Sequence, residues 1–329
     1  MTSSTETAAR SDPRAAGLPD FYIVGSAKSG TTALYEMLRR HPQIYMPESK
    51  EPWFFASELH ERTPPRPEGT PRTLEEYRAW FRDAQPGQRV GEASVLYLWS
   101  RTAARAIADV RPDARIIAIL REPASLLRSL HIQFVETYVE TEHDFTKALA
   151  LEDERRAGRS IPHNSYWPSA LLYSDHVRYV EQLRRYHELF GRDQVLVLIY
   201  DDFRDDNQGT VRRVLRFLEV NDEVSLDVVE ANPTVHVRSP RLHHLLRTLS
   251  VSNAPGALAA RSAVKALTPN VLRRWALEAT KQRVVYGEPA PADEALMAQL
   301  RRRFAPEVAA LGAYLGRDLT RLWGYDGVT

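Results

Sequence analysis

The sequence predicts an α/β protein in which a central, mostly parallel sheet of four to five strands is flanked by helices. Short apolar runs of strand length, at Phe21–Val24, Ile116–Leu120 and Val195–Phe203, alternate with amphipathic helical segments. Such alternation is typical of parallel sheets built from strand–helix–strand units. A loop of small residues follows the first run and opens a helix, which predicts a ligand site at the carboxyl end of the sheet.

This loop reads GSAKSGTT, residues 25–32. Its two glycines allow the backbone to wrap closely around an anion, and Lys28 adds a full positive charge. The helix that follows presents exposed N–H groups and the positive end of its dipole. We therefore predict that the loop binds a phosphate group. The residues expected to hold it are Ser26, Ala27, Lys28, Ser29, Gly30, Thr31 and Thr32.

The loop is not a Walker A motif, which reads G-x-x-x-x-G-K-[ST]. Counted from Gly25, the second glycine is Gly30, and Thr31 occupies the position that needs Lys. From these residues alone, a loop like that of a nucleotide kinase and a merely structural turn both stay open. The displaced Lys28 in AKSGTT resembles the 5′-phosphosulfate loop of sulfotransferases that use 3′-phosphoadenosine 5′-phosphosulfate (PAPS). This resemblance implies a P-loop-like, three-layer fold.

The segment SKEPWFF, residues 49–55, places a Lys–Glu pair before three aromatic residues. By itself it indicates either a lined cleft or a hydrophobic staple beneath a loop. Sulfotransferases related to the heparan sulfate enzymes carry a catalytic carboxylate just before such an aromatic pair. The resemblance therefore implies that Glu51 is the catalytic base and that Lys28 stabilises the leaving phosphate.

Residues 62–72 contain four prolines and predict an irregular surface loop, which a helix at Leu74–Phe81 follows. The next segment, Arg89–Tyr97, resembles the family's segment that leads from a strand into a helix beside the acceptor. The animal polysaccharide enzymes carry a Lys within it where this chain has Ala93. We therefore expect a small-molecule or glycoside acceptor rather than a heparan-type chain.

Arg121 directly follows the run Ile116–Leu120, and Pro123 opens a helix that carries Ser129. Proline suits the first helical position because its φ is preset and its missing N–H is not needed there. Taken alone, Arg121 is either an anion ligand or a salt-bridged residue at the sheet edge. The resemblance assigns R-E-P-x₅-S to the 3′-phosphate of PAPS, with a charged fork from Arg121 and a hydroxyl from Ser129.

Downstream patterns predict helices at Asp144–Gly158, Tyr173–Phe190, Val211–Leu218 and Glu294–Leu315, and an aromatic loop, residues 165–168, that lines an acceptor pocket. The resemblance nominates Tyr200 and Arg238 as further nucleotide contacts. Asp201 and Asp202 fit either a Walker B metal site or a solvated strand end. We favour the second interpretation, because sulfuryl transfer does not need the metal, and we predict no metal site.

Some branches of the family use His as the base, and His131 lies closest to the cofactor motif. Two residues along a helix correspond to a rotation of about 200°, so His131 should point away from the face of Ser129. We therefore favour Glu51 as the base and keep His131 as the alternative.

Composition limits the partners and the compartment. A net charge of +1 creates no broad basic field, so we expect no nucleic acid partner. The sequence has no cysteine and no apolar leader or membrane-length stretch, which fits the cytoplasm. We expect a disordered tail at residues 1–18 and a single domain at residues 19–329. Within its C-terminal helical region, residues 240–329, the segment 252–293 either caps the acceptor site or forms a homodimer surface, with a solvated face as the simplest interpretation.

Together these features predict an enzyme that transfers a sulfuryl group from PAPS to a hydroxyl of a small-molecule, glycoside or carbohydrate acceptor. The products are a sulfate ester and adenosine 3′,5′-bisphosphate. One alternative is a phosphotransferase or NTPase with a degenerate P-loop, and another is a non-catalytic nucleotide-binding protein. Arg121 and Ser129 argue against the first alternative, and Glu51 argues against the second.

Overall fold

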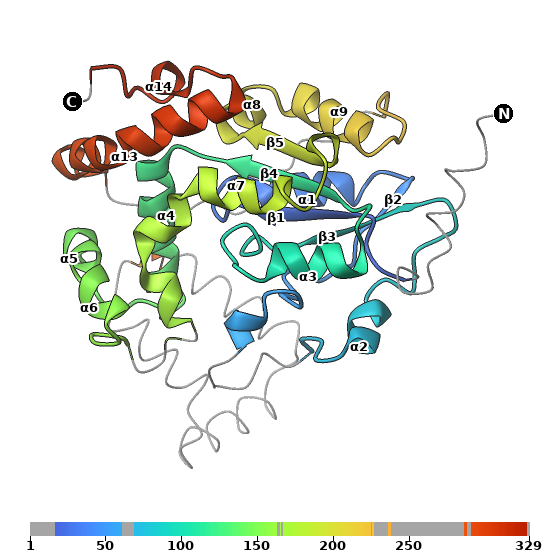
Figure 1. Ribbon diagram of the computed structural model, residues 1–329, viewed down its shortest axis with the longest axis horizontal. Helices are drawn as coiled ribbons and strands as arrows, with labels where there is room; N and C mark the ends of the chain where they lie inside the picture. The colour runs from blue at the N-terminus through green and yellow to red at the C-terminus, as the bar shows by residue number, and fades with distance from the viewer. Residues whose placement is uncertain are drawn as a thin grey trace, which may run out of the picture.

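The computed structural model describes residues 17–60, 69–162, 165, 167–224, 226, 236–237, 286–287 and 291–327. Its centre is a five-stranded sheet in the order β2-β3-β1-β4-β5, in which all neighbouring strands are parallel (Figure 1). The strands are β1 (Phe21–Gly25), β2 (Ile44–Tyr45), β3 (Arg89–Ala93), β4 (Arg115–Leu120) and β5 (Val195–Ile199). The predicted α/β class, with a parallel sheet between helices, is confirmed.

Helices cover both faces of this sheet (Figure 1). The α-helices described are α1 (Thr31–Leu38), α2 (Leu74–Ala79), α3 (Ala103–Val110), α4 (Pro123–Glu136), α5 (Phe145–Ala150), α6 (Glu152–Arg156), α7 (Tyr179–His187), α8 (Tyr200–Asp205), α9 (Asn207–Phe217), α13 (Glu294–Leu315) and α14 (Leu319–Leu322). Single 3₁₀ turns are η2 (Ser57–His60), η3 (Pro168–Leu171), η4 (Tyr173–Val177) and η5 (Arg192–Gln194). A separate antiparallel pair joins β6 (His236–Val237) to β7 (Tyr286–Gly287).

The central strands send alternate side chains into two hydrophobic cores. In β4, Ile116, Ala118 and Leu120 lie in the core shared with α3, α4, α7 and α13, whereas Ile117 and Ile119 lie in the core beneath α1 and α9. All five side chains are fully buried. Burial on both faces explains why this strand reads as a continuous apolar run rather than as an alternating pattern.

The predicted strand Val195–Phe203 is wrong beyond Ile199. The chain turns there into α8, whose first turn carries Asp201 and Asp202. Acidic residues suit the positive end of a helix dipole, so this turn favours a helix start over a continued strand. Phe203 remains buried, but as a residue of the helix.

Two predicted helices are divided. The segment Asp144–Gly158 forms α5 and α6, which are separated at Leu151. The segment Tyr173–Phe190 begins as the 3₁₀ turn η4 and becomes α-helical only after Arg178, whose ψ of 59° is not helical. In both cases apolar spacing alone did not reveal the local break.

Leu18, assigned above to the tail, is buried in the larger core with 4% of its surface exposed. Residues 1–16, residues 61–68 of the Pro-rich loop, and most of the segment 240–290 lie outside the described residues. Among the helices of the described ranges, none has the combination of length and hydropathy that a membrane crossing requires.

Candidate active site

The loop between β1 and α1 has the backbone of an anion site. Gly25 has φ +151°, and a Cβ there would lie 2.7 Å from the Val95 carbonyl oxygen, so only glycine fits. Gly30 precedes α1 with φ +81°, and no side chain caps the helix from that position. The N–H groups of the first turn of α1 are therefore suited to an anion.

Serine side chains fix this loop to the sheet. The Ser26 N–H donates to the Ile119 oxygen at 2.8 Å, and the Ser26 hydroxyl donates to the same oxygen at 3.0 Å. The hydroxyl oxygens of Ser26 and Ser29 lie 2.7 Å apart. Both side chains are buried, so their role in the described structure is to hold the loop in place.

Lys28 lies at the centre of a group of cations. It has φ +61° and is partly buried. Burial lowers the pKa of the Lys28 ammonium; the charge of Glu136 opposes this effect, and those of Arg121 and Lys50 add to it. The Arg121 guanidinium also donates a hydrogen bond of 2.8 Å to the Lys28 backbone oxygen. Such a group of cations is suited to an anion with more than one charge.

Lys50 connects the loop to the predicted base. Its ammonium donates to the Thr32 hydroxyl at 2.6 Å and lies 3.6 Å from a carboxylate oxygen of Glu51. The sequence patterns assigned no role to Lys50, although it directly precedes Glu51. Only the fold shows that Thr32, 18 residues earlier in the sequence, lies beside Lys50.

Glu51 is held in one orientation. Its Oε2 accepts hydrogen bonds from the Trp53 indole N–H at 2.8 Å and the Val95 N–H at 3.1 Å. Its side chain is 18% exposed. Burial raises the pKa of the Glu51 carboxyl above its ordinary value, and Lys50 and these two donors oppose the rise. An oriented carboxylate of raised pKa is a suitable general base.

A second carboxylate lies deeper, on β3. Glu92 is 1% exposed and accepts hydrogen bonds from the hydroxyls of Tyr77 at 2.6 Å and Tyr97 at 3.2 Å. Burial raises the pKa of Glu92 to about 7; hydrogen bonds from Ser94 and the two tyrosines oppose this, and the charge of Glu51 adds to it. Sequence reasoning did not identify Glu92 as an ionisable neighbour of Glu51.

The structure brings Arg121, Ser129 and Tyr200 to one place. The Arg121 guanidinium lies over the Tyr200 ring, 4.8 Å from its centroid, and Tyr179 donates to the Arg121 backbone oxygen at 2.8 Å. Arg121 and Ser129 line the same pocket of about 220 Å³. Arg238 lies outside the described residues.

His131 is engaged elsewhere. Its Nε2 lies 2.9 Å from the Glu142 backbone oxygen, and its ring stacks on Phe145 at 4.9 Å between centroids. Its side chain is buried, and this burial lowers the pKa of the imidazole. These contacts favour a packing role for His131.

Asp201 and Asp202 are already occupied by side-chain partners. Asp201 accepts from the Trp323 indole N–H at 2.9 Å, and Asp202 forms an ion pair with Arg317. Within the described ranges, no group of three or more His, Cys, Asp or Glu side chains is arranged to hold a metal ion.

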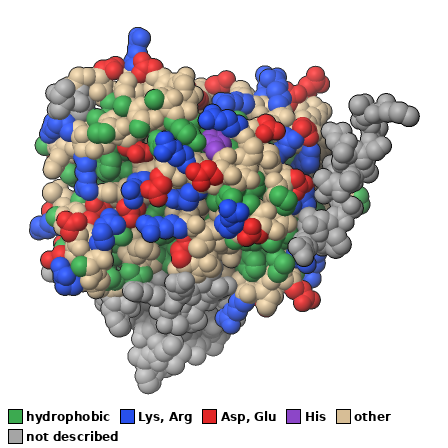
Figure 2. Space-filling view, in the orientation of Figure 1, with side chains coloured by type: hydrophobic (Ala, Val, Ile, Leu, Met, Phe, Trp, Pro, Cys, Tyr) green, Lys and Arg blue, Asp and Glu red, His purple; other side chains and the backbone are tan. Residues whose placement is uncertain are grey.

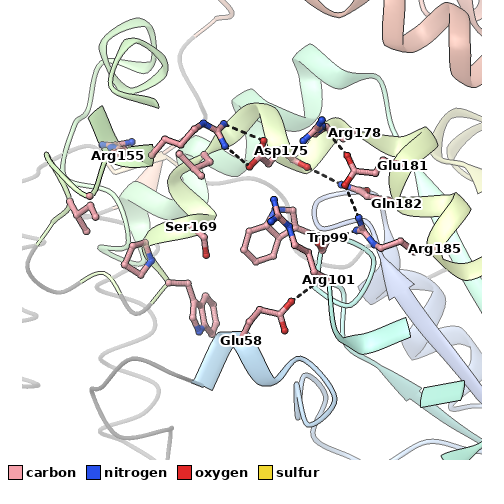
Figure 3. A pocket seen from close by; sticks show the side chains of 16 residues that line it. Glu58, Trp99, Arg101, Arg155, Ser169, Asp175, Arg178, Glu181, Gln182 and Arg185 are labelled. Atoms are coloured by element: carbon pink, nitrogen blue, oxygen red, sulfur yellow. Dashed lines mark hydrogen bonds and ion pairs between the residues drawn. The ribbon is translucent and has the colours of Figure 1, made fainter. Parts of the chain in front are cut away.

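A larger pocket of about 500 Å³ has aromatic side chains in its walls (Figure 3). Its walls include Trp99 and Trp167, and its rim carries Arg101 and Arg178. The Trp167 and Trp53 rings meet edge to face at 4.9 Å between centroids, and Trp53 is the residue that donates to Glu51. Trp53 therefore contacts both Trp167, in the pocket wall, and Glu51, the predicted base.

The fold and this site define an α/β protein with a loop suited to an anion (residues 25–32, named the phosphate loop after its predicted role), a neighbouring Arg–Ser pair and an oriented carboxylate at the carboxyl edge of a parallel sheet. The chain belongs to the sulfotransferase domain family, whose family model matches residues 18–238. The resemblance noted from the loop and the R-E-P-x₅-S segment is confirmed at the level of the family.

Individual relatives agree with this assignment. The chain is 25% identical to mouse carbohydrate sulfotransferase 15 over 278 residues, which cover 68% of this chain and 48% of that protein. It is 27% identical to mouse heparan sulfate glucosamine 3-O-sulfotransferase 3B1 over 205 residues, 61% of this chain and 46% of that protein. The chain thus spans about half the length of these curated relatives.

A solved sulfotransferase from Alicyclobacillus acidocaldarius has the same fold. Its TM-score is 0.66, with 29% sequence identity over 92% of this chain and 98% of that one. The match extends well past residue 238, so it includes most of the C-terminal part of the chain.

Proposed function

We propose that this chain transfers the sulfuryl group of PAPS to an acceptor hydroxyl, releasing a sulfate ester and adenosine 3′,5′-bisphosphate. The observation that carries the proposal is the contact series from Thr32 through Lys50 to Glu51. It joins the end of the phosphate loop to a carboxylate suited to take a proton. A nucleotide-binding protein without catalytic activity has no use for that connection.

The residues present fit the donor. Its 5′-phosphosulfate would face the open N-terminus of α1 and Lys28, and its 3′-phosphate would face Arg121 and Ser129. These groups bind the two anionic ends through charge-assisted hydrogen bonds. The separation of the two anion sites then selects a nucleotide that carries both phosphates.

In the proposed reaction the acceptor oxygen attacks sulfur, and the bond between sulfur and the 5′-phosphate oxygen breaks. The acceptor proton passes to Glu51 as the new S–O bond forms. Negative charge collects on the departing 5′-phosphate, where Lys28 and the amides of α1 stabilise it. Lys50 lies between Thr32, at the end of the loop, and Glu51, and contacts both side chains.

We assign the acceptor to the pocket of about 500 Å³ that includes Trp99 and Trp167 (Figure 3). Flat indole faces suit the apolar face of a sugar or an aromatic ring, and the surrounding polar groups suit hydroxyls. The named relatives are carbohydrate and heparan sulfate sulfotransferases, which supports a glycoside or carbohydrate as well as a small hydroxylated molecule. The cytoplasmic location and a homodimer stay predictions.

Mass spectrometry of products from a panel of hydroxyl acceptors, with PAPS as the donor, tests the proposal. Sulfated product and adenosine 3′,5′-bisphosphate in equal amounts are expected. Trp167→Ala should raise the acceptor KM and leave the affinity for adenosine 3′,5′-bisphosphate unchanged. No sulfated product from any acceptor class, together with nucleotide hydrolysis, would favour an NTPase.

A further inference from the structure

The pocket of about 220 Å³ that holds Arg121 and Ser129 has a second wall, which comes from the C-terminal helix α13. Helix α13 packs against α4, the helix that carries Ser129 (Figure 1). Its contributions to the pocket are Glu294, Met297 and Arg301, which are spaced three and four residues apart. That spacing places all three on one face of the helix. The family model ends at residue 238, so nothing in the family match assigns a role to this wall.

Arg301 is the basic residue of α13 that faces this pocket. The Arg301 guanidinium Nε is buried and has no hydrogen-bond partner among the described residues. The next two arginines of the helix differ, since Arg302 is exposed and Arg303 forms an ion pair with Glu152 at 2.9 Å. A buried guanidinium nitrogen without a partner costs free energy, and an anionic ligand removes that cost.

The balance of charge in the pocket also points to an anion. Among the described residues that line it, Arg121, Arg128 and Arg301 accompany one carboxylate, the exposed Glu294. The buried acid next to Arg121 is engaged by other donors. Glu122 accepts hydrogen bonds from the N–H groups at the start of α4 and from the Tyr325 hydroxyl at 2.5 Å.

We infer that Arg301 is a third ligand of the nucleotide 3′-phosphate, contributed by a helix beyond the part of the chain that matches the family model. Because Arg301 lies on α13 and Ser129 on α4, the 3′-phosphate would lie between these two helices. The inference rests on the proposed function, because it takes PAPS as the donor. It gives the C-terminal helix a direct part in distinguishing 3′-phosphorylated nucleotides from others.

Isothermal titration calorimetry of the full chain with adenosine 3′,5′-bisphosphate and with 5′-AMP tests the inference. Arg301→Ala should weaken binding of the bisphosphate by about 10- to 100-fold, the worth of one charged hydrogen bond. Binding of 5′-AMP should change by less than about threefold, because the lost contact is to the 3′-phosphate only. Arg302→Ala is the matched control, with unchanged affinity for both nucleotides.

Arg301→Lys retains the charge but loses the planar fork, and an intermediate loss is expected. Equal losses for the two nucleotides in Arg301→Ala, or no loss for either, would overturn the inference. The wild-type chain tests the proposed function separately. If it does not prefer the bisphosphate over 5′-AMP, the proposed function and this inference both fail, whereas a wild-type preference that Arg301→Ala leaves intact defeats only the inference.

Discussion

The Arg121 guanidinium donates a hydrogen bond of 2.8 Å to the backbone oxygen of Lys28. This contact joins two motifs that lie 93 residues apart in the chain. Arg121 therefore does two things in the site, since it presents positive charge to the small pocket and holds the phosphate loop through its backbone. A variant at Arg121 should reveal both effects.

Arg121→Ala should weaken binding of adenosine 3′,5′-bisphosphate by about 2 kcal/mol or more, because a charged hydrogen bond to the 3′-phosphate is lost. Binding of 5′-AMP should weaken by a smaller, measurable amount, because the Lys28 oxygen loses its donor. Calorimetry with both nucleotides measures the difference. Arg115→Ala, at the opposite end of β4, is the control. Equal losses for the two nucleotides would restrict Arg121 to a structural role.

Glu51→Gln should lower kcat by about 10² to 10⁴-fold, the usual contribution of a general base, and leave nucleotide affinity nearly unchanged. Steady-state kinetics and calorimetry on the same preparation check both parts. Glu48→Gln, an exposed carboxylate three residues earlier, should behave like the wild type. Near-normal turnover of the Glu51 variant would move the base to another group, with His131 the first to examine.

The pH dependence of kcat/KM should report the charges around Glu51. Glu51 acts as a carboxylate, so activity falls as pH drops through its pKa, which burial places above the ordinary value. Lys50 lowers that pKa, so Lys50→Met should move the acid limb to higher pH. The charge of Glu51 raises the pKa of Glu92, whereas the pKa of Glu51 is set by burial, Lys50, Trp53 and Val95, so Glu92→Gln should leave the limb nearly in place.

Lys147→Met, at an exposed lysine, is the control for these profiles. Thermal melts of each variant separate a shifted limb from a loss of folded protein. An acid limb that stayed in place or moved to lower pH in the Lys50 variant would contradict its assignment to Glu51.

Activity with PAPS should persist in excess EDTA, and ATP with Mg²⁺ should yield no phosphorylated product. Enzymes that use ATP place Mg²⁺ with a Ser or Thr after the P-loop Lys and with a strand-end Asp. Here Thr31 replaces that Lys, and Asp201 and Asp202 are engaged by Trp323 and Arg317. Activity that vanished with EDTA and returned with Mg²⁺ would restore the phosphotransferase hypothesis.

Arg155→Met should destabilise the fold by about 3 to 5 kcal/mol, because it leaves the buried Glu140 carboxylate unpaired. The two side chains are 1% and 0% exposed and lie 2.7 Å apart. Urea denaturation gives the change in the free energy of unfolding. Arg156→Met, whose side chain is 51% exposed, should cost about 0 to 1 kcal/mol. A cost for Arg155 no larger than that for Arg156 would contradict the prediction.

The order and type of the central elements could be predicted from the sequence, because strands buried on both faces leave continuous apolar runs. The first and second of the three predicted runs, Phe21–Val24 and Ile116–Leu120, became β1 and β4 nearly to the residue. The ends of the elements were harder to predict, because a polar residue can end one element and begin another within an apolar pattern. Tyr200 begins a helix rather than ending a strand, and Arg178 interrupts a helix that apolar spacing had joined.

The site residues likewise fall into those that local sequence nominates and those that only the fold brings together. Lys28, Glu51 and Arg121 could be nominated because each stands in a recognisable pattern beside a turn, and their roles stay predictions. Lys50 and Arg301 could not be assigned, because their role depends on which distant segment packs beside them. Arg301 in particular lies in a run of three arginines, and only the placement of α13 against α4 decides which one faces the pocket.

Tyr325 and its acceptor Glu122 are separated by 203 positions in the chain. Synthesis proceeds from the N-terminus, so the phosphate loop, Arg121 and Glu122 leave the ribosome long before Tyr325 does. Until then α4 lacks the hydrogen bond that ties it to the C-terminal segment, and the wall formed by α13 is incomplete. A ligand stabilises only the state that binds it. The contribution of the α13 wall to nucleotide binding is therefore available only to a chain whose C-terminal segment has packed onto α4.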